Sequence, residues 1–275
     1  MIVAESIAQL EHELARPSTR SLVPTMGALH AGHLALLKAA REGGDRVVMS
    51  LFVNPSQFAA GEDLERYPRP LEADLEIAAS AGVDLVFAPS AGEIYPPGFA
   101  TTVTPGPLAD ELCGANRPGH LAAVATVVTK LFALVRPQTA YFGAKDYQQL
   151  VIVKQTARDL NLAVEVVGVP TVRDPDGLAL SSRNVFLSPA ERTQALTLSA
   201  GLRAAQAAYA AGERTAGTLI DACRAELAVD PEYLELRDRE LGAYAPTRPA
   251  VLLVASRFGP TRLIDNILLE AGGNS

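Results

Sequence analysis

Two histidines stand three residues apart in the segment PTMGALHAGH, residues 24–33, where a predicted strand passes into a predicted helix. This spacing at a helix start places His30 and His33 on one face. Gly27 and Gly32 let a phosphate approach the backbone, and the unpaired N–H groups of a first helical turn favour anions. Two imidazoles there can donate hydrogen bonds to phosphate oxygens as pyrophosphate departs. The pair is a candidate nucleotide site, with capping or core histidines and zinc ligands as alternatives.

Zinc is the weaker of these alternatives because the site lacks a recognisable third ligand. The chain has four histidines and two cysteines, and Cys113 and Cys223 stand far apart without metal-ligand spacing. We therefore predict no metal held directly by side chains.

Cations and neutral amides follow other predicted strands. Lys145 comes shortly after Gly143, and Arg183 follows two serines in a loop, so both can bind phosphate. Gln57 and Gln149 can hold hydroxyl or carboxylate oxygens. Each also has an ordinary interpretation, namely a helix start for the lysine and a solvated surface for the other three. The ligand-binding hypothesis depends on their convergence.

The elements that must position these residues are β-branched runs alternating with helical stretches, as far as about residue 172. Such alternation predicts parallel βαβ units, and so an α/β fold with a Rossmann-like, doubly wound parallel sheet. Ligands of such sheets bind beyond the carboxyl ends of the strands. The predicted strands are Ser21–Val23, Arg46–Val53, Val83–Ala88, Thr139–Phe142 and Val164–Val172, and the helices are Leu34–Glu42, Leu71–Ala81, Leu121–Val135 and Asp146–Leu160.

The sequence pattern changes beyond residue 188, where two Ala-rich helical stretches precede three short strands. This order predicts a smaller C-terminal α+β domain. The segment RDPDG at residues 173–177 has strong turn chemistry and marks the join. We therefore expect a nucleotide- and substrate-binding domain over residues 1–176 and a small domain over residues 177–275 that covers the site.

Composition restricts the possible partners. The 275 residues carry 24 Lys and Arg against 31 Asp and Glu, a net charge of −7, so a basic face for nucleic acid is not expected. The sequence shows no signal peptide and no apolar stretch that predicts a membrane span. A cytoplasmic protein with small-molecule substrates is the expectation.

Several short motifs, in order, resemble the pantothenate synthetase (pantoate–β-alanine ligase) family, whose members belong to the Rossmann-like adenylyl-transferring proteins with a histidine signature. The motifs are PTMGALHAGH, VNPSQF, RYPR, EIYP, RPGH, FGAKDYQQL and DGLALSSRN, followed in the C-terminal part by VLLVAS and TRLIDN. The resemblance runs from about residue 22 to residue 187 and then extends into the last strands. Each motif is moderately specific, and the ordered set is very specific.

The resemblance implies a cytoplasmic homodimeric enzyme that joins (R)-pantoate to β-alanine with ATP and Mg²⁺, the metal bound mainly through the phosphates. The reaction would pass through an enzyme-bound pantoyl adenylate, releasing pyrophosphate and then AMP. No covalent enzyme nucleophile is needed, and no Ser/His/Asp or Cys/His arrangement is apparent. A nucleotidylyltransferase acting on a phosphorylated molecule, a nucleotide-sensing scaffold and a metal-dependent hydrolase are the alternatives.

The resemblance also assigns residues. Gln57 and Gln149 would hold pantoate, and Asn54, Tyr67 and Arg117 would line or support the pocket. His33 would be the general acid, and we expect His30, Lys145 and Arg183 to help it neutralise phosphate charge. The implied ATP contacts are Met26, Gly27, Ala28, Leu29, His30, Ala31, Gly32, His33, Gly143, Ala144, Lys145, Asp146, Val172, Leu180, Ser181, Ser182 and Arg183.

Three alanines depart from the common family pattern. Ala31 and Ala144 stand where acidic residues are usual, which alters local charge without removing a named ligand. Ala123 replaces a common glycine and puts the geometry near Arg117 in question.

Overall fold

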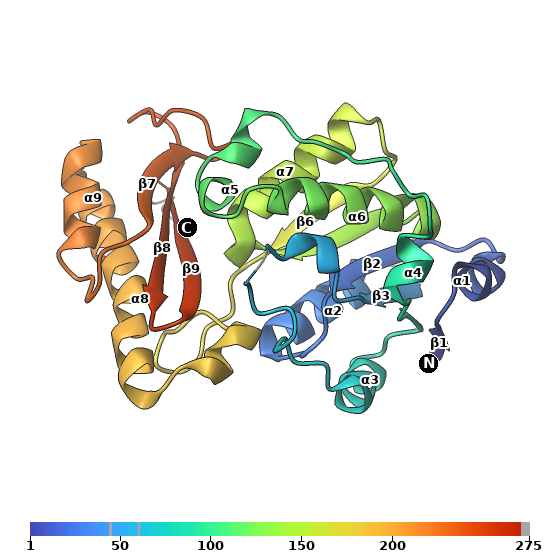
Figure 1. The fold of residues 1–275 in the computed structure, drawn as a ribbon. Coiled ribbons are helices and arrows are strands. Elements are labelled where there is room, and N and C mark those ends of the chain that lie inside the picture. Colours follow the sequence, from blue (N-terminus) through green and yellow to red (C-terminus); the bar gives the residue numbers. More distant parts are fainter. Residues whose placement is uncertain (44–45, 60, 271–275) are drawn as a thin grey trace. The chain divides into compact units, whose positions relative to one another are not determined.

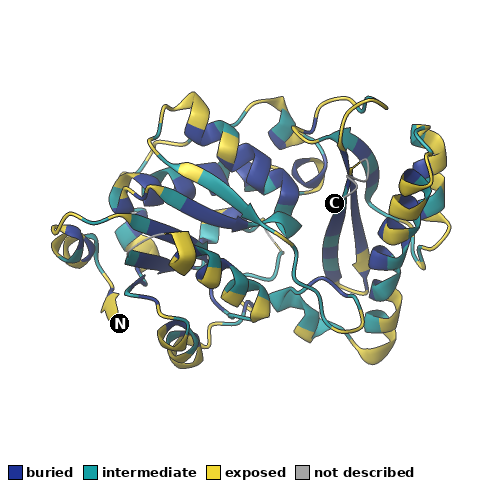
Figure 2. Ribbon diagram, turned by 180° about the vertical axis from the view of Figure 1, so that it is seen from behind, coloured by how far each residue is buried: buried dark blue, intermediate teal, exposed yellow. Residues whose placement is uncertain are grey.

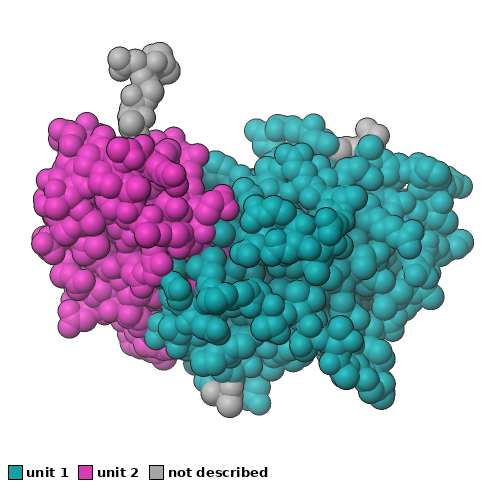
Figure 3. Space-filling view, turned by 90° about the horizontal axis from the view of Figure 1, so that it is seen from above, with its two compact units in different colours: residues 1–144, 149–170 teal, residues 145–148, 171–275 magenta. Residues whose placement is uncertain are grey.

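The computed structural model describes residues 1–43, 46–59 and 61–270 and divides into two units. Unit 1 comprises Met1–Ala144 and Gln149–Pro170, and unit 2 comprises Lys145–Gln148 and Thr171–Ser275 (Figure 3). The division along the chain falls at Pro170, whereas the sequence analysis placed it after Asp176. The four residues from Lys145 to Gln148 are grouped with the second unit although they follow a strand of the first.

Unit 1 contains a parallel sheet of six strands in the order β1-β4-β3-β2-β5-β6 (Figure 1). This confirms the predicted doubly wound α/β class. The strands are β1 (Ile2–Ala4), β2 (Arg20–Thr25), β3 (Arg46–Leu51), β4 (Leu85–Phe87), β5 (Thr139–Gly143) and β6 (Glu165–Val169). The sequence analysis did not find β1, because three residues are too few to show a periodic pattern.

Helices cover both faces of this sheet. They are α1 (Ile7–Leu14), α2 (Ala31–Gly43), α3 (Leu71–Ser80), α4 (Ala91–Ile94), α5 (Cys113–Asn116), α6 (His120–Val135) and α7 (Tyr147–Asp159), the last of which begins in the segment assigned to unit 2. Three 3₁₀ turns add to them: η1 (Pro55–Gln57), η2 (Pro107–Asp110) and η3 (Ala144–Asp146). Helix α1 was not predicted, although Ser6 and Gln9 form a capping box at its start.

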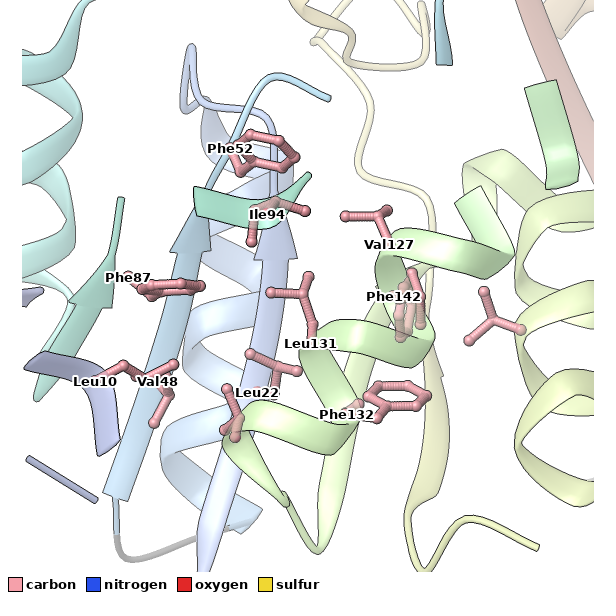
Figure 4. Packing of buried hydrophobic residues seen from close by; sticks show 14 of the residues in the cluster. Leu10, Leu22, Val48, Phe52, Phe87, Ile94, Val127, Leu131, Phe132 and Phe142 are labelled. Atoms are coloured by element: carbon pink, nitrogen blue, oxygen red, sulfur yellow. The ribbon is translucent and has the colours of Figure 1, made fainter. Parts of the chain in front are cut away.

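Alternating strand residues supply two separate cores. Leu22 and Phe142 belong to a cluster that contains α1 and α6 residues, and Figure 4 shows Leu131 and Phe132 of α6 beside them. Val23 and Tyr141, their neighbours in sequence, belong to a second cluster with α2 residues. Successive strand residues point to opposite faces, so a strand covered on both sides must be apolar throughout. The inner strands β2 to β5 are accordingly mostly buried, whereas β1 and β6 at the two edges of the sheet are mostly exposed or half-buried (Figure 2).

Unit 2 contains an antiparallel sheet in the order β7-β8-β9 with its own core. Its elements are η4 (Ser182–Phe186), α8 (Pro189–Ala210), α9 (Ala216–Arg224), β7 (Tyr233–Asp238), β8 (Ala250–Phe258) and β9 (Thr261–Leu269). Gly201 of α8 is in close contact with α9, because a Cβ there would lie 2.6 Å from the carbonyl oxygen of Cys223. The predicted small α+β domain is thus confirmed in its class.

Candidate active site

The carboxyl ends of β2, β3 and β5 lie at one edge of the sheet, since these neighbouring strands are parallel. From β2 the order continues through β3 and β4 on one side and through β5 and β6 on the other. The order therefore reverses between β2 and β5, and open parallel sheets bind ligands beyond the strand ends at such a point. The segments that follow β2 and β5, including residues 26–33, leave the sheet at this point (Figure 1).

The loop after β2 is held by a carboxylate that the sequence analysis did not single out. The N–H groups of Ala28 and Leu29 donate to Asp74 Oδ2 and Oδ1 at 2.8 and 2.7 Å. Asp74 lies in α3 and is 2% exposed. Gly27 and Ala28 have φ angles of 84° and 52°, a backbone form in which successive N–H groups converge on one anion. In the sequence, Asp74 is indistinguishable from an ordinary acidic residue in a first helical turn.

His30 and His33 lie together at the start of α2, with ring centroids 4.1 Å apart. The Nδ1 atom of His33 accepts from the His30 N–H at 3.2 Å, and that of His30 accepts from the Gly32 N–H at 3.1 Å. Our expectation of unpaired N–H groups is therefore wrong at these two positions, because imidazoles cap them. Each neutral ring then carries its proton on Nε2. Capping and phosphate binding are compatible, since they use different nitrogens.

The segment after β3 holds two of the predicted substrate residues. Asn54 is fully buried, and its Oδ1 accepts from the Ser56 hydroxyl at 2.7 Å and the Tyr95 hydroxyl at 2.9 Å. Its Nδ2 is 3.5 Å from the carbonyl oxygen of Ala123, a backbone contact that does not depend on the side chain at 123. Asn54 is therefore a structural residue of this segment. Burial raises the pKa of the Tyr95 phenol, which keeps it in the protonated form needed to donate.

Gln57 ends the 3₁₀ turn η1 and is 9% exposed. Within residues 1–43, 46–59 and 61–270, its side-chain amide has no hydrogen-bond partner. A nearly buried amide with unused donors and acceptors is suited to a polar ligand. Tyr67 is also buried but packs its ring edge-on against Phe58, with centroids 5.8 Å apart.

Arg117 supports Gln57 through the backbone. Its Nη2 donates to the Gln57 carbonyl oxygen at 3.0 Å, and the Nδ1–H of His120 donates to the same oxygen at 2.8 Å. Glu62 accepts from Arg117 Nε and Nη2, both at 2.7 Å. The contributions of Glu62 and His120 were not predicted. The RPGH motif contained the histidine, but no sequence pattern marks the glutamate.

The segment after β5 carries Lys145 and Gln149. Lys145 is tied within unit 2, where its carbonyl oxygen accepts from Asn266 Nδ2 of β9 at 2.8 Å. The Tyr147 hydroxyl donates to the carbonyl oxygen of Arg239 at 3.0 Å, and burial raises the pKa of this phenol. Lys145 Nζ lies 3.8 Å from the Asp146 carboxylate. Gln149 is half-buried and belongs to unit 1.

The predicted ATP contacts Val172 and residues 180–183 lie in unit 2. The Leu180 N–H donates to the Val172 carbonyl oxygen at 3.0 Å, which brings the two residues side by side. Ser181 Oγ accepts from the Arg183 N–H at 3.3 Å and caps η4. The intervening turn is closed by the Asp174 N–H, which donates to the Leu178 carbonyl oxygen at 2.8 Å, and Arg173 ties it to β9 by a bidentate pair with buried Asp265, at 2.6 and 3.0 Å.

Both cysteines are buried, and burial raises the pKa of Cys223 to about 12. In the ranges 1–43, 46–59 and 61–270, no group of three His, Cys, Asp or Glu side chains is placed to hold a metal ion. In the same ranges, no helix combines the length and apolar character that a membrane span requires.

Comparison with known proteins gives a consistent result. A family model described as pantoate-beta-alanine ligase matches residues 2–268. A pantothenate synthetase of Mycobacterium sp. (strain KMS) is 55% identical over 258 residues, which is 92% of this chain and 82% of the relative. Pantothenate synthetase 1 of Bradyrhizobium diazoefficiens is 53% identical over 279 residues, which is 98% of this chain and 99% of the relative.

Comparison with solved structures points to the same family. A pantothenate synthetase from Thermus thermophilus superposes with a TM-score of 0.93 at 49% identity, covering 97% of this chain and 99% of that one. A pantoate-beta-alanine ligase from Francisella tularensis, in complex with beta-gamma ATP and beta-alanine, gives a TM-score of 0.82 at 34% identity and covers 99% of both chains.

Proposed function

The chain belongs to the pantoate-β-alanine ligase family, and we propose that it condenses (R)-pantoate with β-alanine to pantothenate using ATP. The observation that supports this most directly is the placement of His30 and His33 at the point where the strand order reverses. Their Nδ1 atoms accept from the backbone of the loop, so each neutral ring carries its proton on Nε2, the nitrogen that can donate to a phosphate.

The first step would be attack of the pantoate carboxylate on the α-phosphorus of ATP. One P–O bond forms and another breaks, giving pantoyl adenylate and pyrophosphate. The developing negative charge needs preorganised donors, and the Nε2–H groups of the histidines supply them on rings already fixed at Nδ1. We assign His33 as the general acid, with Lys145 and Arg183 as additional phosphate ligands.

The second step would be attack of the β-alanine amine on the activated carbonyl carbon. An amide bond forms, the bond to AMP breaks, and the amine loses a proton. Gln57 suits the role of holding pantoate, because its nearly buried amide can donate to and accept from a hydroxy acid. A neutral amide favours a carboxylic acid over the phosphorylated acceptor of a nucleotidylyltransferase. Gln149 is proposed as its partner.

We propose that Mg²⁺ enters with ATP rather than in a protein cage. The donor sets of the described residues fit this, since no group of three candidate ligands gathers there. Magnesium commonly keeps waters and binds through substrate phosphates. When bound, it would neutralise phosphate charge. We also propose a cytoplasmic homodimer, which sedimentation velocity and cell fractionation would test.

The activity is tested by incubating the protein with Mg·ATP and pantoate, with and without β-alanine, and identifying the products. We expect pyrophosphate and a retained pantoyl adenylate without β-alanine, then free AMP and pantothenate when it is added. Absence of pyrophosphate under both conditions would contradict the proposal. Omission of Mg²⁺ should abolish both steps.

A further inference from the structure

The backbone carbonyl of Gln57 is held by a cluster of three side chains, Glu62, Arg117 and His120, which we call the Gln57 clamp. Arg117 Nη2 and His120 Nδ1 donate to the carbonyl oxygen at 3.0 and 2.8 Å. A carbonyl oxygen has two lone pairs, so both are used. The N–H of Phe58, which shares a peptide with this carbonyl, donates to the Pro55 carbonyl oxygen at 3.2 Å, and the Gln57 N–H donates to the Asn54 carbonyl oxygen at 3.2 Å, so the backbone is held on both sides of Gln57.

Glu62 determines how the arginine of the clamp is oriented. Its two oxygens accept from Arg117 Nε and Nη2 at 2.7 Å each, and bidentate pairing fixes the plane of a guanidinium. The remaining Arg117 nitrogen, Nη1, lies 2.9 Å from His120 Nε2. Because arginine only donates, His120 must accept at Nε2 and carry its proton on Nδ1, where it faces the Gln57 carbonyl.

The carboxylate is suited to this role because it is partly shielded and remains ionised. The side chains of Arg117 and Glu62 are 12% and 24% exposed. Burial by itself would raise the pKa of Glu62, but hydrogen bonds and charge from Arg117 outweigh it, so the pKa is lowered overall. An ionised Glu62 therefore persists through the neutral range.

We propose that Glu62 is a positioning residue for pantoate binding: by fixing the Arg117 fork it holds the Gln57 backbone, and so directs the Gln57 amide toward the substrate. This inference rests on the proposed function, in which Gln57 holds pantoate. Neither Glu62 nor His120 contacts the substrate in this scheme. Arg117 also acts through the backbone of Gln57 rather than as a substrate ligand.

The test compares Glu62→Gln with Glu65→Gln as a matched control. Glu65 lies in the same segment, is exposed, and has no hydrogen bond or ion pair within the described part of the chain. Steady-state rates give KM for pantoate and for ATP separately, and urea unfolding reports stability. We expect Glu62→Gln to raise KM for pantoate by on the order of 10-fold, because small misplacements of a binding group are costly. KM for ATP should change less than about 2-fold, and Glu65→Gln should match the wild type.

A double-mutant cycle with Gln57→Ala shows whether Glu62 acts through Gln57. If it does, Glu62→Gln raises KM for pantoate in the wild-type background and has little further effect in Gln57→Ala. Equal increases in the two KM values, or full additivity in the double variant, would overturn the positioning role.

The same cycle separates the two levels of inference. If Gln57→Ala leaves KM for pantoate unchanged, the proposed assignment of Gln57 fails. If Gln57→Ala raises it and Glu62→Gln does not, only the role of Glu62 fails. Should Glu62→Gln not fold, Arg117→Lys takes its place, since lysine keeps the charge but cannot bridge Glu62 and the Gln57 carbonyl as a fork.

Discussion

Replacing Asp74 by asparagine should loosen the loop that carries the histidine pair. Asp74 is 2% exposed and accepts two backbone hydrogen bonds, from Ala28 at 2.8 Å and Leu29 at 2.7 Å. Asparagine retains one acceptor but turns an NH₂ group toward the other backbone N–H. Hydrogen bonds to charged groups contribute about 1.5–3 kcal/mol, and a buried donor left unpaired costs about 1–3 kcal/mol.

The expected loss is about 2.5–6 kcal/mol if the loop stays in place, because one charged hydrogen bond is lost and one donor is unpaired. The loop can avoid part of this cost by detaching from α3. In that case the free energy of unfolding falls less, while KM for ATP rises and pyrophosphate release slows. Urea unfolding and a pyrophosphate assay on the same sample measure both quantities.

The control is Glu76→Gln, an exposed position on the same helix whose side chain has no hydrogen bond or ion pair within the described residues. It should leave both measurements unchanged. An Asp74→Asn protein within about 0.5 kcal/mol of the wild type, with an unaltered KM for ATP, would refute this reasoning. The backbone N–H groups would then have to be satisfied by water or by another group.

Four further outcomes are expected. His33→Ala should slow adenylate formation by on the order of 10²–10³-fold, as loss of a transition-state donor does, measured by single-turnover pyrophosphate release; unchanged turnover would remove the assignment. Gly27→Ala should destabilise the protein by about 1–3 kcal/mol in urea unfolding, because φ is 84° and the new Cβ would lie 2.8 Å from Asp74 Oδ2. The pKa of Glu62 is lowered in the folded state, so this carboxylate stabilises the fold above its ordinary pKa of 4.5 and loses that effect as the pH falls. The difference in free energy of unfolding between the wild type and Glu62→Gln should therefore shrink when urea unfolding is repeated at pH values down to 3. Cys223, with a pKa of about 12, should resist alkylation at pH 8 until the protein is unfolded, and rapid labelling of the native state would contradict its burial.

The sequence alone determined the features that depend on local pattern. Apolar runs bounded by turn residues located the strands from β2 to β6, and their alternation with helices predicted a parallel sheet. The sheet then implied that residues after the strand ends converge, which directed attention to His30, Gln57 and Lys145. The expected order of helices and strands in unit 2 follows from the same local signals. These predictions needed only neighbouring residues and the geometry of regular elements.

Tertiary structure alone decided which side chains hold the site in place. Asp74 is far in sequence from the loop that it binds, and Glu62 is similarly distant from Arg117. Lys145 comes directly after Ala144, the last residue of this stretch of unit 1. Its carbonyl oxygen nevertheless accepts a hydrogen bond from Asn266 of β9, within unit 2. In each case, a polar group with many possible partners found one through contacts remote in sequence. Local propensity does not predict such pairs. They form only when tertiary packing buries both polar groups and brings them within hydrogen-bonding distance of each other.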